Sequence, residues 1–218
     1  MNTKTFSPAK APLFGARQLL ALAYALAAVL WVVWCAVGCG VMLSHRAAGE
    51  MPTGLVAPDG LECGSFAPYS SNQWWVAPDD DPAWYLSTDA DPHIFWRGQG
   101  YIETVRLHAR HRLPPGAVTL YYLLPGQTDY TEAQKVFAWQ SAEGEYTFDL
   151  GGKTVAGLRI DPDSAGGIPT LFYGVELNPA TPWYLRFVPD AGQLLLLLAA
   201  PLVAAAFAAW LQRLWHLA

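Results

Sequence analysis

The segment "LRIDPDSAGGIPTLFYGVEL", residues 158–177, decides the fold class. Apolar and polar residues alternate on both sides of a cluster of Pro, Asp, Ser and two Gly residues. A period of two is typical of strands that bury one face, and the Gly-rich cluster favours a tight turn between them. The segment therefore predicts a β-hairpin that closes a β-domain.

The same pattern of short strands separated by turns extends over residues 84–177. Short runs rich in β-branched and aromatic residues, such as "YIETVRLHAR", "VTLYYLL" and "EYTFDL", are separated by turn sequences such as "LPPG", "PGQTD" and "SAEG". Many short strands at regular spacing are typical of a β-sandwich or barrel. Within one run, the alternation places Val105 and Leu107 on one face and Arg106 and His108 on the other.

Both ends of the chain are apolar. Residues 19–43 and 194–211 contain no charged side chain, and as helices they would be about 37 Å and about 27 Å long. The hydrocarbon core of a bilayer is about 30 Å thick, so we predict two transmembrane helices. Two alternatives for the first segment are a cleaved signal peptide, whose apolar core is shorter, and a lipoprotein site at Cys39.

The charges give the expected orientation of these helices. Lys4, Lys10 and Arg17 precede the first helix without an acidic residue among them, and all 18 acidic residues lie between Glu50 and Asp190. The positive-inside bias therefore predicts a plasma (inner) membrane protein with two spans and both termini in the cytoplasm. The region between the helices is then extracytoplasmic.

These observations divide the chain into seven parts. We expect a cytoplasmic tail over 1–17, a transmembrane helix over 18–44, a Pro/Gly-rich lead-in over 45–83, a β-sandwich over 84–180, an interfacial linker over 181–192, a second transmembrane helix over 193–212 and a cytoplasmic tail over 213–218. Trp74 and Trp75 in the lead-in are expected to anchor on the core or at the membrane interface. Cys63 is the single cysteine outside the helices, so the sandwich has no internal disulfide.

Three stretches carry a resemblance to a known group of domains: "LYYLLPGQTDYTEAQKVFAW", "GEYTFDL" and "GLRIDPDSAGGIPTLFYGVEL". They resemble jelly-roll domains related to galactose-binding and carbohydrate-binding-module sandwiches, which lie outside the membrane in bacterial envelope glycosyltransferases and polytopic glycan-processing proteins. The matching elements are Tyr121 and Tyr122, the loop 130–132 and the closing residues 159–162. The resemblance implies an all-β jelly-roll sandwich that binds or positions an envelope glycan.

The candidate ligand site lies on one of the predicted strands. Four basic residues at alternate positions would project from one face about 6.6 Å apart: Arg106, His108, Arg110 and Arg112. Such a stripe suits phosphate or uronate groups of an envelope polymer, or anionic lipid headgroups. The alternative, which the net charge of −5 favours, is a solvated face neutralised by acids across the sheet. Tyr122 is added as the aromatic ligand-binding residue, although either Tyr121 or Tyr122 must point into the core.

Three acidic groups are candidate sites of chemistry. Asp161 and Asp163 suit calcium, or they are turn residues that bond to their own backbone. Asp89, Asp91 and His93 suit a metal or catalytic cluster, or a junction from loop to strand. Glu143 and Glu145 resemble a glycosidase pair, or the solvated tip of a hairpin. The second interpretation is favoured each time, so we expect no enzyme activity and no cofactor, with calcium at Asp161 and Asp163 as the alternative.

The resulting function is a membrane-anchored, non-enzymatic domain whose partners are the lipid bilayer and either an envelope glycan or a polytopic glycan-assembly protein. Nucleic acid is disfavoured by the acidity of the chain. The rival function is a structural subunit that docks in a larger membrane complex. Small residues at every fourth position, which allow close helix packing in lipid, support such docking: Ala21 and Ala25, Cys35 and Cys39, and Ala200, Ala204 and Ala208.

Overall fold

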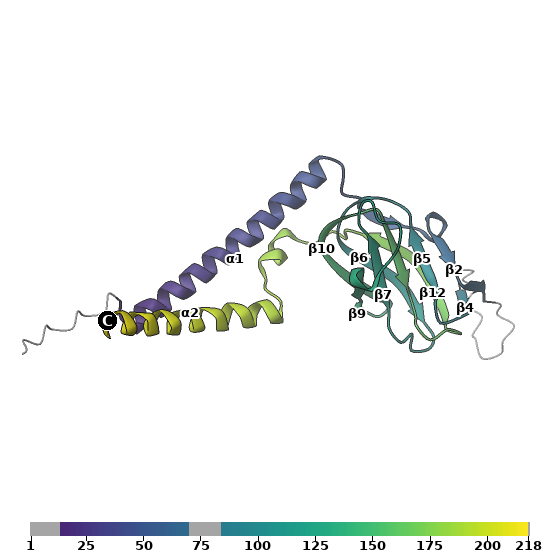
Figure 1. The fold of residues 1–218 in the computed structure, drawn as a ribbon. Coiled ribbons are helices and arrows are strands. Elements are labelled where there is room, and N and C mark those ends of the chain that lie inside the picture. The colour runs from purple at the N-terminus through teal and green to yellow at the C-terminus, as the bar shows by residue number, and fades with distance from the viewer. Residues whose placement is uncertain (1–13, 70–83, 218) are drawn as a thin grey trace, which may run out of the picture. The chain divides into compact units, whose positions relative to one another are not determined.

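The computed structural model describes residues 14–69 and 84–217, and Figure 1 shows the ribbon. The chain divides into two compact units, residues 1–41 together with 181–218, and residues 42–180. The predicted anchors Trp74 and Trp75 lie outside the described residues, as do Lys4 and Lys10.

The unit of residues 42–180 consists of two antiparallel sheets (Figure 1). The seven-stranded sheet contains β3 (Phe66–Pro68), β4 (Trp84–Ser87), β12 (Pro169–Leu177), β6 (Gly100–His111), β10 (Glu145–Val155) and β9 (Trp139–Ala142) in this order, and β1 (Gly54–Val56) also pairs with β12. The five-stranded sheet contains β2 (Glu62–Gly64), β5 (His93–Trp96), β11 (Gly157–Asp161), β7 (Thr119–Leu123) and β8 (Lys135–Phe137). Two short 3₁₀ helices, η1 (Pro58–Gly60) and η2 (Glu132–Gln134), lie in the connections. β1, β2 and β3 fall in the stretch assigned to a lead-in, because three-residue strands are too short to show a period.

One core lies between the two sheets. The alternation along β6 turns Val105 and Leu107 inward, where both are fully buried. Phe148 of β10 and Leu158 and Ile160 of β11 meet them there, each at most 1% exposed. Burying a side chain of this size contributes about 1.5–3 kcal/mol, so the alternating pattern itself stabilises the sandwich. The predicted all-β jelly-roll sandwich between two apolar helices is confirmed.

The segment 158–177 forms two strands and a turn, but its prediction as a hairpin is wrong. β11 pairs with β5 and β7 in one sheet, whereas β12 pairs with β1, β4 and β6 in the other. The turn therefore crosses from one layer of the sandwich to the other. No β-ladder hydrogen bonds join the two strands across this turn. The buried Asp163 carboxylate holds the turn instead, because it accepts hydrogen bonds from the N–H groups of Ala165 and Gly166 at 3.2 and 3.0 Å.

The unit of residues 1–41 and 181–218 contains most of α1 (Ala16–Ala47), the 3₁₀ helix η3 (Trp183–Phe187) and α2 (Ala191–Leu217). Both α-helices are long and apolar enough to cross a membrane. Three side chains of α1 donate hydrogen bonds to backbone carbonyls of the C-terminal segment: Tyr24 to Leu198 at 2.9 Å, Trp31 to Phe187 at 3.2 Å and Cys35 to Arg186 at 3.3 Å.

The packed faces of α1 and α2 differ in part from the small-residue pattern. Cys35 is 6% exposed and Ala205 8%, whereas Ala204 is exposed. Ala21 and Ala25 are exposed as well. Four residues at about 100° each turn the helix about 40° past one full turn. A stripe chosen by a spacing of four alone can therefore miss the buried face by one position.

Candidate functional site

A β-bulge in β12 presents an aromatic ring on the outer face of the seven-stranded sheet. Phe172 lies opposite Ala109 and Gly174 opposite His108, so Tyr173 is the extra residue of the bulge. Bulges re-aim side chains, and Tyr173 is 49% exposed although both of its neighbours are buried.

Gly174 brings the edge of β1 close to this ring. Its φ is +135°, and a Cβ atom at this position would lie 2.5 Å from the carbonyl oxygen of Val56. Only glycine tolerates this approach. Because Val56 and Leu55 can pass so close to β12, the exposed Leu55 side chain lies beside the bulge.

The turn between β9 and β10 forms the opposite wall. Gly144 has a φ of +76°, and its carbonyl oxygen accepts the N–H of Ala109 at 2.9 Å. This bond holds the turn against β6, so that Glu145 lies opposite His108 in the ladder. Glu143 precedes Gly144 at the tip of the turn.

These elements enclose a hollow of about 580 Å³ that is open to solvent, lined by Leu55, His108, Arg110, Glu143, Gly144, Glu145 and Tyr173. We call it the sheet hollow. β6 forms its floor, and β10 and β12 flank β6 on either side. The β10 wall and the β12 wall are two inter-strand spacings apart, about 10 Å. The volume of the hollow falls in the range of small-ligand sites.

The basic residues of the floor are paired with acids of neighbouring strands. Arg106 Nη1 lies 3.3 Å from Glu176 Oε2, and Arg106 Nε lies 3.8 Å from Glu145 Oε2. His108 Nε2 is also 3.3 Å from Glu176, and Arg110 Nε is 3.8 Å from Glu143. The structure thus has the neutralised face that the sequence offered as the alternative to a cationic stripe.

Two members of the predicted ligand set lie elsewhere. β6 ends at His111, so Arg112 follows the strand and its N–H donates to the carbonyl oxygen of Pro169 at 3.0 Å. Tyr122 is 9% exposed and belongs to the core, because its neighbour Tyr121 takes the outward position. The exposed aromatic residue beside the stripe is Tyr173, which sequence reasoning missed. The signal for it was Gly174, since a glycine inside a strand pattern suggests a bulge.

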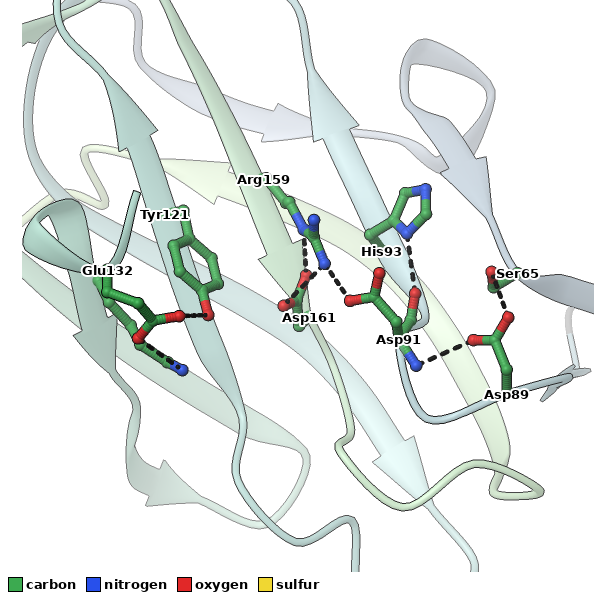
Figure 2. Close-up of polar contacts among 9 residues, drawn as sticks. Ser65, Asp89, Asp91, His93, Tyr121, Glu132, Arg159 and Asp161 are labelled. Atoms are coloured by element: carbon green, nitrogen blue, oxygen red, sulfur yellow. Dashed lines mark hydrogen bonds and ion pairs between the residues drawn. The ribbon is translucent and has the colours of Figure 1, made fainter. Parts of the chain in front are cut away.

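The outer face of the five-stranded sheet carries a second set of polar and aromatic residues. The register aligns one residue from each strand across the sheet, in the order Glu62, Phe95, Arg159, Tyr121 and Lys135. Figure 2 shows Arg159 hydrogen bonded to both Asp161 and Asp91, with Arg159 Nε 2.8 Å from Asp161 Oδ1. It also shows the Tyr121 hydroxyl donating to Glu132 at 2.9 Å.

This second face satisfies its own charges. Lys135 Nζ is 3.3 Å from Glu132, and Arg97 Nε is 2.9 Å from Glu62. Cations also cover the rings, with the Arg97 guanidinium 4.3 Å from the centroid of the Phe95 ring. A ligand on this face would have to displace these contacts. In the sheet hollow the ion pairs made by Glu143 and Glu145 are longer, at 3.8 Å, and it is therefore the better candidate site.

Two of the three predicted acidic groups lie near this second face, whereas the third, Glu143 and Glu145, lines the sheet hollow. Burial raises the pKa of Asp161, and its ion pair with Arg159 opposes the shift. Asp89 accepts hydrogen bonds from the hydroxyl of Ser65 and from the N–H of Asp91, both at 2.9 Å (Figure 2). These bonds fit the junction from loop to strand that the sequence offered as the alternative to a metal or catalytic cluster. Within residues 14–69 and 84–217, no group of three or more His, Cys, Asp and Glu residues is arranged to hold a metal ion.

Comparison with known proteins found similar folds only among solved structures. No family model and no curated protein matches the chain. The xylan-binding module CBM86 of Roseburia intestinalis has 15% identity and a TM-score of 0.36, covering 58% of this chain and 95% of its own. CBM32-1 from a family 31 glycoside hydrolase of Clostridium perfringens has 19% identity and a TM-score of 0.35, covering 56% and 95%. The family 32 module of Clostridium perfringens NanJ, solved with galactose, has 9% identity and a TM-score of 0.36, covering 58% and 98%.

These neighbours are carbohydrate-binding modules, the group of sandwiches that the sequence resembles. The resemblance to envelope glycosyltransferases stays a prediction. At such low identity and TM-score, what these modules bind does not carry over to this chain.

Proposed function

We propose that residues 42–180 form a non-catalytic domain that binds a cell-envelope glycan in the sheet hollow. The observation that carries the proposal is the exposed Tyr173 ring, turned outward by a bulge beside ion-paired Arg, His and Glu side chains. A sugar offers C–H groups that pack on an aromatic ring and hydroxyl groups that both donate and accept hydrogen bonds. Carboxylates and guanidinium groups held in pairs are well-oriented partners for such hydroxyls.

The ion pairs change the ligand expected from the sequence. A cationic stripe would favour uronate or phosphate polymers, but Glu145 and Glu176 neutralise Arg106, and Glu143 lies beside Arg110. Arg106, His108 and Arg110 remain in the proposed site as hydrogen-bond donors. Binding by a polyanion would require the carboxylates to be displaced.

The proposal includes the location of the domain. Two apolar helices long enough to span a bilayer flank it in the sequence, and the acidic residues all lie between Glu50 and Asp190. Both features support a plasma membrane protein with cytoplasmic termini and an extracytoplasmic domain. The domain would then meet envelope polymers at the membrane surface.

The test uses the full chain in phosphatidylcholine nanodiscs and calorimetric titration with a panel of neutral and amino oligosaccharides. We expect at least one to bind, and Tyr173→Ala to weaken it by about tenfold, because a stacked ring contributes on the order of 1 kcal/mol. Tyr121→Ala on the opposite sheet is the matched control. No binding by any oligosaccharide would refute the function, and loss in the control alone would move the site to the other face.

The second candidate function is a structural subunit of a membrane complex. The observation that favours it is the exposure of apolar side chains on both helices, such as Val33 and Trp34 of α1 and Leu195 of α2. Lipid or a polytopic partner would cover them. Stoichiometric co-purification of a polytopic protein in mild detergent, lost on changing the exposed helix residues and unaffected by Tyr173→Ala, would support this function.

A further inference from the structure

The sheet hollow has more negative than positive groups. Among the residues that line it, two carboxylates, of Glu143 and Glu145, face one guanidinium group, of Arg110, with His108 as the additional titratable residue. With histidine counted as neutral, one negative charge is left over. This excess is a property of the site that the proposed function does not use.

The excess charge lies at the rim of the hollow. Glu176 lies between Arg106 and His108 at 3.3 Å from each and is only 25% exposed. The Glu143 side chain is 86% exposed, and its 3.8 Å separation from Arg110 is too long for a hydrogen bond. Glu145 is likewise 3.8 Å from Arg106, and one of its carboxylate oxygens, Oε2, accepts the Ser141 hydroxyl at 3.4 Å. Both rim carboxylates therefore keep acceptor capacity for a ligand.

The opposite wall adds a second feature that favours a cation. Tyr173 projects from β12, across β6 from the two rim carboxylates, and is 49% exposed. The face of an aromatic ring attracts a cation within about 6 Å of its centre. A cationic group in the hollow would thus have carboxylates on one side and a ring on the other.

We infer that the sheet hollow selects glycans whose sugars carry a protonated amine. This rests on the proposed function and names its substrate class. An ammonium group compensates the unpaired charge and donates to Glu143 and Glu145, while the sugar ring packs on Tyr173. A neutral N-acetylated sugar leaves the excess charge uncompensated, and a uronate adds a further negative charge beside the two lining carboxylates.

The experiment compares two probes that differ in N-acetylation and so in this charge: a tetramer of β-1,4-linked glucosamine and its fully N-acetylated counterpart. Each is titrated into the full chain in phosphatidylcholine nanodiscs. We expect the amine form to bind about fivefold to tenfold tighter, the size that two exposed ion pairs and a ring contact supply. The preference should narrow as salt rises from about 0.1 M to about 1 M, because the Debye length falls from about 10 Å to about 3 Å.

Two charge-neutralised variants locate the effect. Glu143→Gln combined with Glu145→Gln should bind both tetramers equally, because the acceptors remain and the charge is lost. Glu62→Gln combined with Glu132→Gln removes the same charge from the five-stranded sheet and should keep the preference. Unchanged melting temperatures show that both variants fold.

Each alternative result has one meaning. If neither tetramer nor any oligosaccharide of the panel binds, the proposed function itself fails. If oligosaccharides bind but the two tetramers bind equally, the function stands and selection for the amine is refuted. If the preference survives in the Glu143 and Glu145 variant, or disappears in the control variant, the assignment to the sheet hollow is overturned.

Discussion

At the scale of single residues, His111 shows how burial sets a pH dependence. It lies at the end of β6, where its Nδ1 is 3.1 Å from the Tyr146 hydroxyl and its Nε2 is buried. Burial lowers the pKa of His111, and the nearby Asp163 carboxylate and a backbone hydrogen bond oppose the shift. The folded state therefore favours the neutral imidazole.

This shift predicts loss of stability in acid. A histidine whose folded pKa lies below the unfolded value of about 6.5 contributes its full stability above that pH and loses it as the pH falls further. We expect the melting temperature of the full chain in nanodiscs to fall between pH 7 and pH 5. His111→Leu should flatten that slope while lowering the melting temperature at pH 7, because the contact with the Tyr146 hydroxyl is lost. An unchanged slope in His111→Leu would show that another group titrates.

At the scale of elements, local sequence patterns predicted which residues form strands more reliably than which strands pair with one another. The alternation of Val105, Leu107, Leu158 and Ile160 showed which faces are buried, because period and burial are properties of one strand. It did not show that β11 and β12 belong to different sheets, since an alternating run looks the same with either set of neighbours. The helix faces show the same limit, because small-residue spacing suggested Ala204 and the packed residue is Ala205.

The two neighbouring alanines give a matched test of helix packing. Ala205→Leu places a larger side chain where α2 is buried against the rest of its unit, and we expect it to weaken the helix pair by on the order of 1 kcal/mol. Ala204→Leu adds the same atoms on an exposed face and should be nearly neutral. Unfolding by SDS, followed by tryptophan fluorescence, measures both. Equal effects, or a larger effect at Ala204, would contradict the packing described for α2.

At the scale of the whole molecule, the apolar helices could be predicted and the sheet hollow could not. Hydropathy is a property of contiguous residues, so residues 19–43 and 194–211 can be recognised as apolar helices from the sequence alone. The hollow draws on Leu55, His108, Glu143 and Tyr173, which three different strands and a turn bring together. Only the register of β6 against β10 and β12, with the bulge at Tyr173, makes them neighbours.

The orientation of the whole chain can be read from one cysteine. Cys63 lies on β2 and is exposed, whereas Cys35 and Cys39 lie on the apolar helix α1. Partial burial raises the pKa of the Cys63 thiol, so less thiolate is present at neutral pH and labelling should speed up toward about pH 8.5. We expect a membrane-impermeant maleimide to label Cys63 in spheroplasts, and Cys63→Ser to abolish the signal. Labelling only after the membrane is permeabilised would place residues 42–180 in the cytoplasm, where they would meet no envelope glycan.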